Sequence, residues 1–276
     1  MLWSVITIVV TTARNYIRHQ SANQAGSVAF SFLIAMFPLL ILAASAAGFI
    51  GHAGDAAALA RQVLQYAPPA VRDALRPAVD QVLAQRSQAL LTLGLVATVW
   101  TASSGLQAIR TALNRAYGVE HGLPFWKARL KVTLFTLVAG AATLAAFGSV
   151  IVMPYVWRFL QDDLGMNVRS LWVQDGVRYG VAFVVLSALY ALLYGWLPDV
   201  PQKLRTVLPG ALCGAALWLC AAALLSQSLR SAGKLVLVYG GFAGMVATLI
   251  FLYLSASTLI VGAEVNGVLR GRSADR

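Results

Sequence analysis

The most constraining feature of this sequence is an uncharged stretch of 29 residues, Leu235–Ala263, that ends at a single carboxylate. A helix rises ~1.5 Å per residue, so about 20 apolar residues suffice to cross the hydrocarbon core of a bilayer. The stretch is therefore long enough to span a membrane. Glu264 follows it directly, and Arg270 and Arg272 come soon after. An acid at the end of a membrane helix is either an interfacial residue or a place where chemistry or transport occurs.

The composition places the whole chain in the membrane class. Hydrophobic residues make up 59% and charged residues 11% of its 276 positions, whereas soluble domains carry about 25% charged residues. The net charge of +11 agrees with the excess of lysine and arginine on the cytoplasmic side of membrane proteins. Because the basic residues are scattered among loops and form no single stripe, we expect no nucleic-acid partner.

Six apolar segments predict an all-α integral membrane fold with six transmembrane helices. They lie at about 26–50, 89–108, 132–156, 177–197, 207–227 and 240–268. In this prediction residues 1–25 form a cytoplasmic arm, 26–269 form the membrane domain, and 270–276 form a short cytoplasmic tail. Within the arm, apolar and basic positions separate at helical spacing, which predicts an amphipathic helix on the membrane surface.

An even number of spans places both termini on the same side of the membrane. If that side is the cytoplasm, more of the 21 lysines and arginines lie inside than outside, as the positive-inside rule requires. We therefore expect a multi-pass protein of a bacterial inner membrane with cytoplasmic N- and C-termini. The loop at 52–88 then lies in the periplasm. Its two amphipathic patterns, separated by Pro68 and Pro69, predict two short helices.

Small and polar residues predict where the helices meet. A polar stripe enters the first span and should face other helices or a wet cavity, because lipid cannot satisfy polar groups. Pro38 should kink that span. Glycines in the last two spans allow another helix to approach closely. The stripe consists of Gln24, Ser27 and Ser31, and the packing glycines are Gly210, Gly214, Gly240 and Gly244.

Four stretches resemble the YihY/BrkB-type inner-membrane proteins of bacteria. They are AGSVAFSFLIAMFPLLI, GLQAIRTALNRAYGVEHGLPFWKARL, LPDVPQKLRTVLPGALCGAALW and VYGGFAGMVATLIFLYLSASTLIVGAEVN. Together they cover the chain from its first span to its last. The resemblance implies a six-helix inner-membrane protein. The family has carried two labels, a virulence factor and a tRNA-processing ribonuclease.

The residues of this chain do not favour the ribonuclease label. Metal-dependent nucleases need clustered histidines and carboxylates, whereas His19, His52 and His121 lie far apart in sequence and outside the spans. No nucleophile motif or phosphate-binding loop occurs either. We therefore expect no enzyme, no metal site and no cofactor. Cys213 and Cys220 should be small buried apolar residues, since ~10 Å along one helix separates them, too far for a disulfide.

Glu264 is the strongest single candidate for a functional residue. It would act as a proton- or cation-linked carboxylate, or as part of a head-group site. The structural alternative is an interfacial acid paired with Arg110 or Arg205. Amides from neighbouring cytoplasmic ends would complete a polar cluster around it. The candidate transport or head-group residues are Glu264, Asn266, Asn114, Arg110, Gln24, Ser27 and Ser31.

An aromatic and basic group is predicted to anchor the protein at the membrane interface. It consists of Trp126, Lys127 and Arg129, with Tyr239 at the opposite interface. The basic members are also candidates for binding anionic lipid head groups. The expected partners are membrane lipids, and the pattern is compatible with a homo-oligomer.

Two functions remain open at this point. The favoured one is a transporter or translocator of lipid or envelope components. The alternative is a non-catalytic structural or partner-binding membrane protein that supports envelope integrity.

Overall fold

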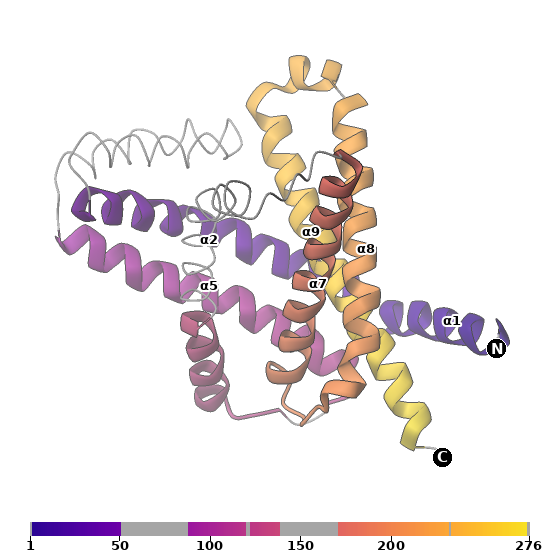
Figure 1. Ribbon diagram of the computed structural model, residues 1–276. Helices are drawn as coiled ribbons and strands as arrows, with labels where there is room; N and C mark the ends of the chain where they lie inside the picture. Colours follow the sequence, from indigo (N-terminus) through magenta and orange to yellow (C-terminus); the bar gives the residue numbers. More distant parts are fainter. Residues whose placement is uncertain (1, 51–87, 120–121, 139–170, 232, 275–276) are drawn as a thin grey trace, which may run out of the picture.

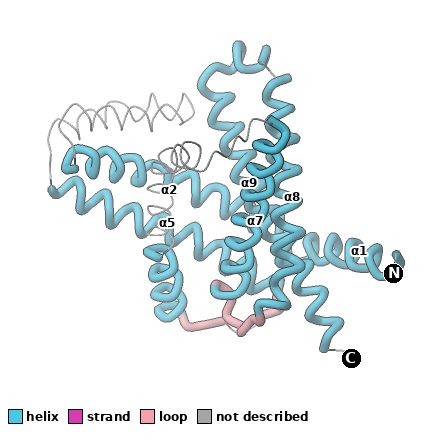
Figure 2. The backbone as a smooth tube through the Cα atoms, viewed as in Figure 1, coloured by secondary structure: helices cyan, strands magenta, loops and turns pink. Residues whose placement is uncertain are grey.

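Residues 2–50, 88–119, 122–138, 171–231 and 233–274 are described by a computed structural model of the chain. All secondary structure within these ranges is helical (Figure 2), which confirms the all-α prediction for this part of the chain. Almost all of the loop predicted at 52–88 and most of the span predicted at 132–156 lie outside the described residues, as do His52 and His121.

The helices are α1 (Leu2–Arg18), α2 (Ser21–Ile50), α5 (Gln88–Ala116), α7 (Leu171–Trp196), α8 (Leu204–Ser231) and α9 (Gly233–Ala274), with a further helical segment at 125–138. Three stretches are long and apolar enough to cross a membrane, namely Ser21–Leu39, Leu204–Ser228 and Gly244–Gly271. A shorter apolar helix covers Ala182–Trp196. The described part is thus built as a membrane protein, and the count of six spans stays a prediction.

The helices form two groups that cross each other (Figure 1). α2 and α5 lie side by side and run across the molecule, whereas α7, α8 and α9 form an upright group. α9 packs closely on α8 and also contacts α1, α2 and α5. α9 therefore joins the two groups, which gives its side chains more neighbouring elements than those of α8.

The chain changes direction between α1 and α2 at Gln20. This residue has a φ of 54°, in the left-handed region that ends a regular helix. α1 consequently projects away from the bundle while α2 enters it (Figure 1). α1 rests on the bundle through a face that contains buried Thr12, whereas Ile6, Val10 and Ile17 are exposed. The exposed apolar face fits the predicted position on a membrane surface.

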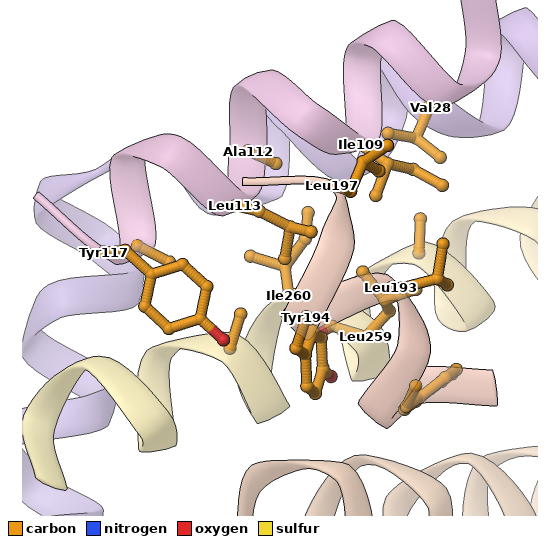
Figure 3. Close-up of a cluster of buried hydrophobic side chains, with 14 of the residues drawn as sticks. Val28, Ile109, Ala112, Leu113, Tyr117, Leu193, Tyr194, Leu197, Leu259 and Ile260 are labelled. Atoms are coloured by element: carbon orange, nitrogen blue, oxygen red, sulfur yellow. The ribbon is translucent and has the colours of Figure 1, made fainter. Parts of the chain in front are cut away.

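A buried core lies where the two helix groups meet (Figure 3). Leu113 of α5, Tyr194 of α7 and Ile260 of α9 are almost fully buried there. The phenol of Tyr194 donates a 2.6 Å hydrogen bond to the carbonyl oxygen of Leu259. This bond matters because an unpaired hydroxyl in an apolar interior costs about 1–3 kcal/mol.

Glycines bring α8 and α9 into close contact. A methyl group on Gly210 would overlap the carbonyl oxygen of Gly262, and one on Gly214 would lie 3.1 Å from the carbonyl oxygen of Thr258. Such close approach is the usual basis of helix packing in membranes, where van der Waals contact is the main attraction. Gly244 is half-buried. Tyr239 and Gly240 belong to α9, but their surroundings lie outside the described residues.

The prediction for the cysteines was wrong in one respect. Cys220 is exposed on α8 and Cys213 is only partly buried. In a membrane protein the outer face of a helix contacts lipid. A small apolar side chain is therefore as stable on that face as in the protein core.

The polar stripe on α2 is not part of the buried core, and what it faces stays a prediction. Ser27 is exposed, and Gln24 and Ser31 are only half-buried. The face of α2 that packs against its neighbours is instead rich in small apolar residues, including Ala25 and Ala29. Small side chains occupy that face because they let a neighbouring helix approach closely. Pro38 lies inside α2, which continues to Ile50.

Candidate functional site

The carboxyl group of Glu264 is buried where α1, α2 and α9 meet. The residue is 0% exposed. Its Oε1 lies 2.8 Å from Nδ1 of His19 and accepts a 3.0 Å hydrogen bond from Oγ of Ser21. These two residues flank the left-handed Gln20, so the turn between α1 and α2 places both of them against the same carboxyl oxygen.

The second oxygen of this carboxyl group differs from the first in its hydrogen bonding. Oε2 of Glu264 is buried and has no hydrogen-bond partner among the described residues. A buried carboxylate with an unsatisfied oxygen costs several kcal/mol, whereas a protonated carboxyl group carries no charge there. The described residues thus satisfy one oxygen of this buried carboxyl group and leave the other without a partner.

His19 connects this buried group to the surface. Its side chain is 18% exposed, whereas that of Glu264 is completely enclosed. His19 is thus the accessible member of the contact with Glu264. Tyr16 lies on the same side of α1, and burial raises the pKa of its phenol, which keeps it neutral at physiological pH.

A second buried carboxylate, Asp199, lies in the link between α7 and α8. The Arg110 guanidinium of α5 binds it with two nitrogens, Nε at 3.0 Å from Oδ1 and Nη2 on Oδ2. The backbone amide of Leu123 and Nδ2 of Asn114 each donate a 3.0 Å hydrogen bond to Oδ2. Asn114 also accepts a 2.9 Å hydrogen bond from the Asp199 amide. We call Arg110, Asn114, Leu123 and Asp199 the Asp199 cluster.

The Asp199 cluster fixes both the charge and the position of this carboxylate. Burial alone would raise the pKa of Asp199, but Arg110, the Leu123 amide and Asn114 together hold it below its ordinary value. Lys131 reinforces the cluster from the 125–138 helix. Its Nζ lies 3.6 Å from Oδ1 of Asp199 and donates to the carbonyl oxygens of Leu197 and Pro198.

The predicted pairing of Glu264 with Arg110 or Arg205 was wrong. Glu264 pairs with His19, Arg110 pairs with Asp199, and Arg205 is exposed. The reason is geometric: the end of α5 faces the α7–α8 link, whereas Glu264 faces the α1–α2 turn. The Asp199 cluster was missed because its acid lies 89 residues from Arg110. The available signal was a lone acid in a short link predicted on the same side as the most basic loop.

Asn266 forms a third polar contact that is separate from Glu264. Its Oδ1 accepts a 2.7 Å hydrogen bond from the Gly210 amide, and its Nδ2 donates to the carbonyl oxygen of Val207 at 3.0 Å. The Nδ2 group also lies 3.4 Å from the hydroxyl of Tyr117. Burial raises the pKa of Tyr117 to about 12, although this hydrogen bond acts in the opposite direction. Asn266 thus holds α8 against α9.

The predicted anchor residues lie on the 125–138 helix. Trp126 is 80% exposed, and Lys127 is exposed beside it. Arg129 instead turns toward α5, where its guanidinium lies 4.1 Å from the ring centroid of Trp100. It also donates a 3.2 Å hydrogen bond to the Trp100 carbonyl oxygen. Arg129 therefore joins this helix to α5, and the anchoring role of the other two residues stays a prediction.

Within the described ranges, no three or more histidine, cysteine, aspartate or glutamate side chains come together in a group that could hold a metal ion. His19 and Glu264 form a pair, and Asp199 is held by nitrogen donors. What the described residues offer chemically is thus a buried carboxyl group at Glu264, with partners on one oxygen, and a fixed ion pair at Asp199.

Comparison with known proteins places this architecture in one group of membrane proteins. The sequence model of the "Virulence factor BrkB" family matches residues 12–276. The "ribonuclease-like protein" YfkH of Bacillus subtilis (strain 168) is 29% identical over 257 residues, which cover 93% of each chain. No solved structure matches the chain.

Other relatives are longer proteins. The UPF0761 membrane protein of Azoarcus sp. (strain BH72) is 28% identical over 246 residues, covering 89% of this chain but 59% of the relative. That of Aromatoleum aromaticum is 27% identical with the same coverage. The chain thus spans nearly all of YfkH and about three fifths of these UPF0761 relatives.

Proposed function

Because the chain belongs to the BrkB family of membrane proteins, we propose that it moves a lipid or another envelope component across the bacterial inner membrane, with Glu264 as a proton-carrying group. The observation that carries this proposal is the state of the Glu264 carboxyl group. It is fully buried, one of its oxygens contacts His19 and Ser21, and the other has no partner among the described residues.

A group of this kind suits coupled transport for energetic reasons. An ionised carboxylate in a dry interior is costly, whereas a protonated one is not. Uptake or loss of one proton therefore changes how strongly α9 holds the α1–α2 turn. A carrier alternates between two conformations, and a bound ion must be able to shift the equilibrium between them. At the contact of Glu264 with His19 and Ser21, binding or release of a single proton would shift this balance.

The position of α1 supports the same function. α1 contacts α9 but projects from the bundle (Figure 1), and several of its apolar side chains are exposed. It can therefore move without disrupting the buried core at Leu113 and Tyr194. Its last turn leads into His19, so a movement of α1 would open or close the path to Glu264.

The test is a proton-uptake assay on the full chain reconstituted in liposomes. A pH-sensitive dye inside the vesicles reports proton entry after an acid pulse, and a parallel assay follows a fluorescent phospholipid across the bilayer. Glu264→Gln keeps the shape of the side chain but cannot carry the proton, so both signals should fall to the level of empty vesicles. The matched variant Asp199→Asn should lower the yield of folded protein. The activity of each folded molecule should equal that of the wild type.

One outcome would rule the proposal out. If Glu264→Gln protein is folded and as active as the wild type in both assays, Glu264 carries no transported proton.

The second candidate function is a structural membrane protein that supports the envelope. It is favoured by the Asp199 cluster and by Asn266, whose polar groups bind firmly to neighbouring helices and form a fixed frame. Under this function Glu264→Gln should lower thermal stability, and a second change at its partner His19 should partly restore it. Nothing in the described residues supports extending the ribonuclease-like name of YfkH to this chain.

A further inference from the structure

A groove between α7 and α8 takes no part in the site at Glu264. It has a volume of about 600 Å³, is open on one side, and has walls that are almost entirely apolar. The larger side chains of its walls are Phe183, Val184, Leu192, Trp196, Leu208 and Leu212. Its floor includes Gly195, where an added methyl group would meet no atom within 4 Å. The two helices thus lie side by side without filling the space between them.

Two polar groups in this groove have no partner. Oγ of Ser187 and Nε2 of Gln202 are buried and lack hydrogen-bond partners among the described residues. Ser187 lies about one helical turn from the Phe183 end and is only 6% exposed, and Gln202 lies at the other end, in the α7–α8 link. Leaving a buried donor unsatisfied costs about 1–3 kcal/mol. Of the two, Gln202 lies at the end of the groove, where rotation of its side chain would bring its amide to a ligand that supplies acceptor oxygens.

The end of the groove at Gln202 is positively charged. Lys203 and Arg205 follow immediately in the sequence, and both are exposed. The neighbouring carboxylate, Asp199, does not offset them, because it is bound by Arg110 and Asn114. A ligand that reaches this end meets an amide donor and two free cations, which together favour an anionic group.

The length of the groove matches a lipid chain. From Phe183 to Trp196 it follows α7 for 13 residues, or ~20 Å at ~1.5 Å per residue. One leaflet of a bilayer is ~15 Å deep, half of the ~30 Å hydrocarbon core. Trp196 stands at the charged end, where tryptophan is commonly found at a membrane interface.

We propose that this groove binds an anionic phospholipid from the surrounding bilayer. One acyl chain lies along the apolar walls over Gly195, and the phosphate accepts hydrogen bonds from Gln202 beside Lys203 and Arg205. The site is separate from Glu264 and does not depend on whether that residue carries a proton.

Native mass spectrometry of the purified full chain tests this site, with dioleoyl phosphatidylglycerol as the anionic probe and dioleoyl phosphatidylcholine as the control. The wild type should bind phosphatidylglycerol about tenfold more tightly, which corresponds to ~1.4 kcal/mol. Gln202→Leu together with Lys203→Ala should remove that preference, since only the acyl-chain contacts remain.

A matched pair of substitutions in α7 separates the groove from the rest of the surface. Gly195→Leu fills the groove, whereas Gly180→Leu lies on the same helix outside it. Neither position has an atom within 4 Å of an added methyl group, so both variants should fold. Gly195→Leu should lower phosphatidylglycerol binding about tenfold, and Gly180→Leu should leave it unchanged. Glu264→Gln should also bind as the wild type does.

Two results would overturn the proposal. One is equal binding of phosphatidylglycerol and phosphatidylcholine by the wild type. The other is equal phosphatidylglycerol binding by the Gly195→Leu and Gly180→Leu proteins. Either result leaves the proposal for Glu264 standing, because that proposal is tested by proton uptake.

Discussion

The two buried carboxylates of this protein are held in opposite ways. Asp199 has donors on both oxygens, from a guanidinium, an amide side chain and a backbone amide. Among the described residues, Glu264 has partners on one oxygen only, the side chains of His19 and Ser21. The comparison separates an acid that is fixed as an anion from an acid that we propose exchanges a proton.

The largest effect should come from removing the fixed acid. Asp199→Ala leaves Arg110 buried without its partner, and breaking a buried ion pair in this way costs about 3–5 kcal/mol. Thermal unfolding in detergent, followed by size-exclusion chromatography, should show a strongly lowered midpoint. The double variant Asp199→Leu, Arg110→Leu should recover part of the loss, because no unpaired charge then remains. If the single and double variants unfold alike, the two residues are not coupled.

Acid should weaken the Asp199 cluster in a defined direction. The pKa of Asp199 in the folded protein lies below its ordinary value because of Arg110, Leu123 and Asn114 acting against burial. The stabilisation is therefore complete above the ordinary pKa of aspartate, about 3.9, and is lost as pH falls through the lower folded-state pKa. The unfolding midpoint of the wild type should fall steeply at such acid pH.

The Asp199→Asn variant is the control for this acid effect. It should be less stable than the wild type at pH 7 and show a flatter decline at acid pH, since its side chain does not titrate. Identical curves for the two proteins would show that other carboxylates set the acid limit.

The smallest effect on stability should come from Glu264→Gln. The amide keeps the shape of a protonated carboxyl group and can still accept a hydrogen bond from Ser21, so the free energy of unfolding should change by less than about 1 kcal/mol. Glu264→Ala, which leaves a cavity and removes both contacts, is the comparison and should cost more. A Glu264→Gln protein as unstable as Asp199→Ala would mean that Glu264 is a structural anion like Asp199.

The sequence predicted the helices of this protein better than the contacts between them. Hydropathy and helical spacing are local properties, so the apolar stretch before Glu264 and the glycines of α8 could be recognised directly. The partners of the two acids are not local: Glu264 lies 245 residues from His19, and Asp199 lies 89 residues from Arg110. No pattern within one helix shows such pairs, because the packing of several helices decides them.

The role of α1 illustrates the same limit. Its periodicity predicted an apolar and a basic face, but not the third face around Thr12 that contacts α9. That contact brings His19 to Glu264. A polar side chain on an amphipathic helix gives no sign of which buried group it will meet, and the left-handed turn at Gln20 cannot be read from the residue type.

The most direct test of this account is whether Glu264 exchanges a proton while Asp199 does not. Infrared difference spectra of the reconstituted protein, recorded between alkaline and acidic buffer, report the protonation of individual carboxyl groups. We predict a carboxyl band that appears reversibly between the two buffers, is absent from Glu264→Gln and persists in Asp199→Asn. A band that persists in Glu264→Gln, or disappears in Asp199→Asn, would contradict the assignment of the proton site to Glu264.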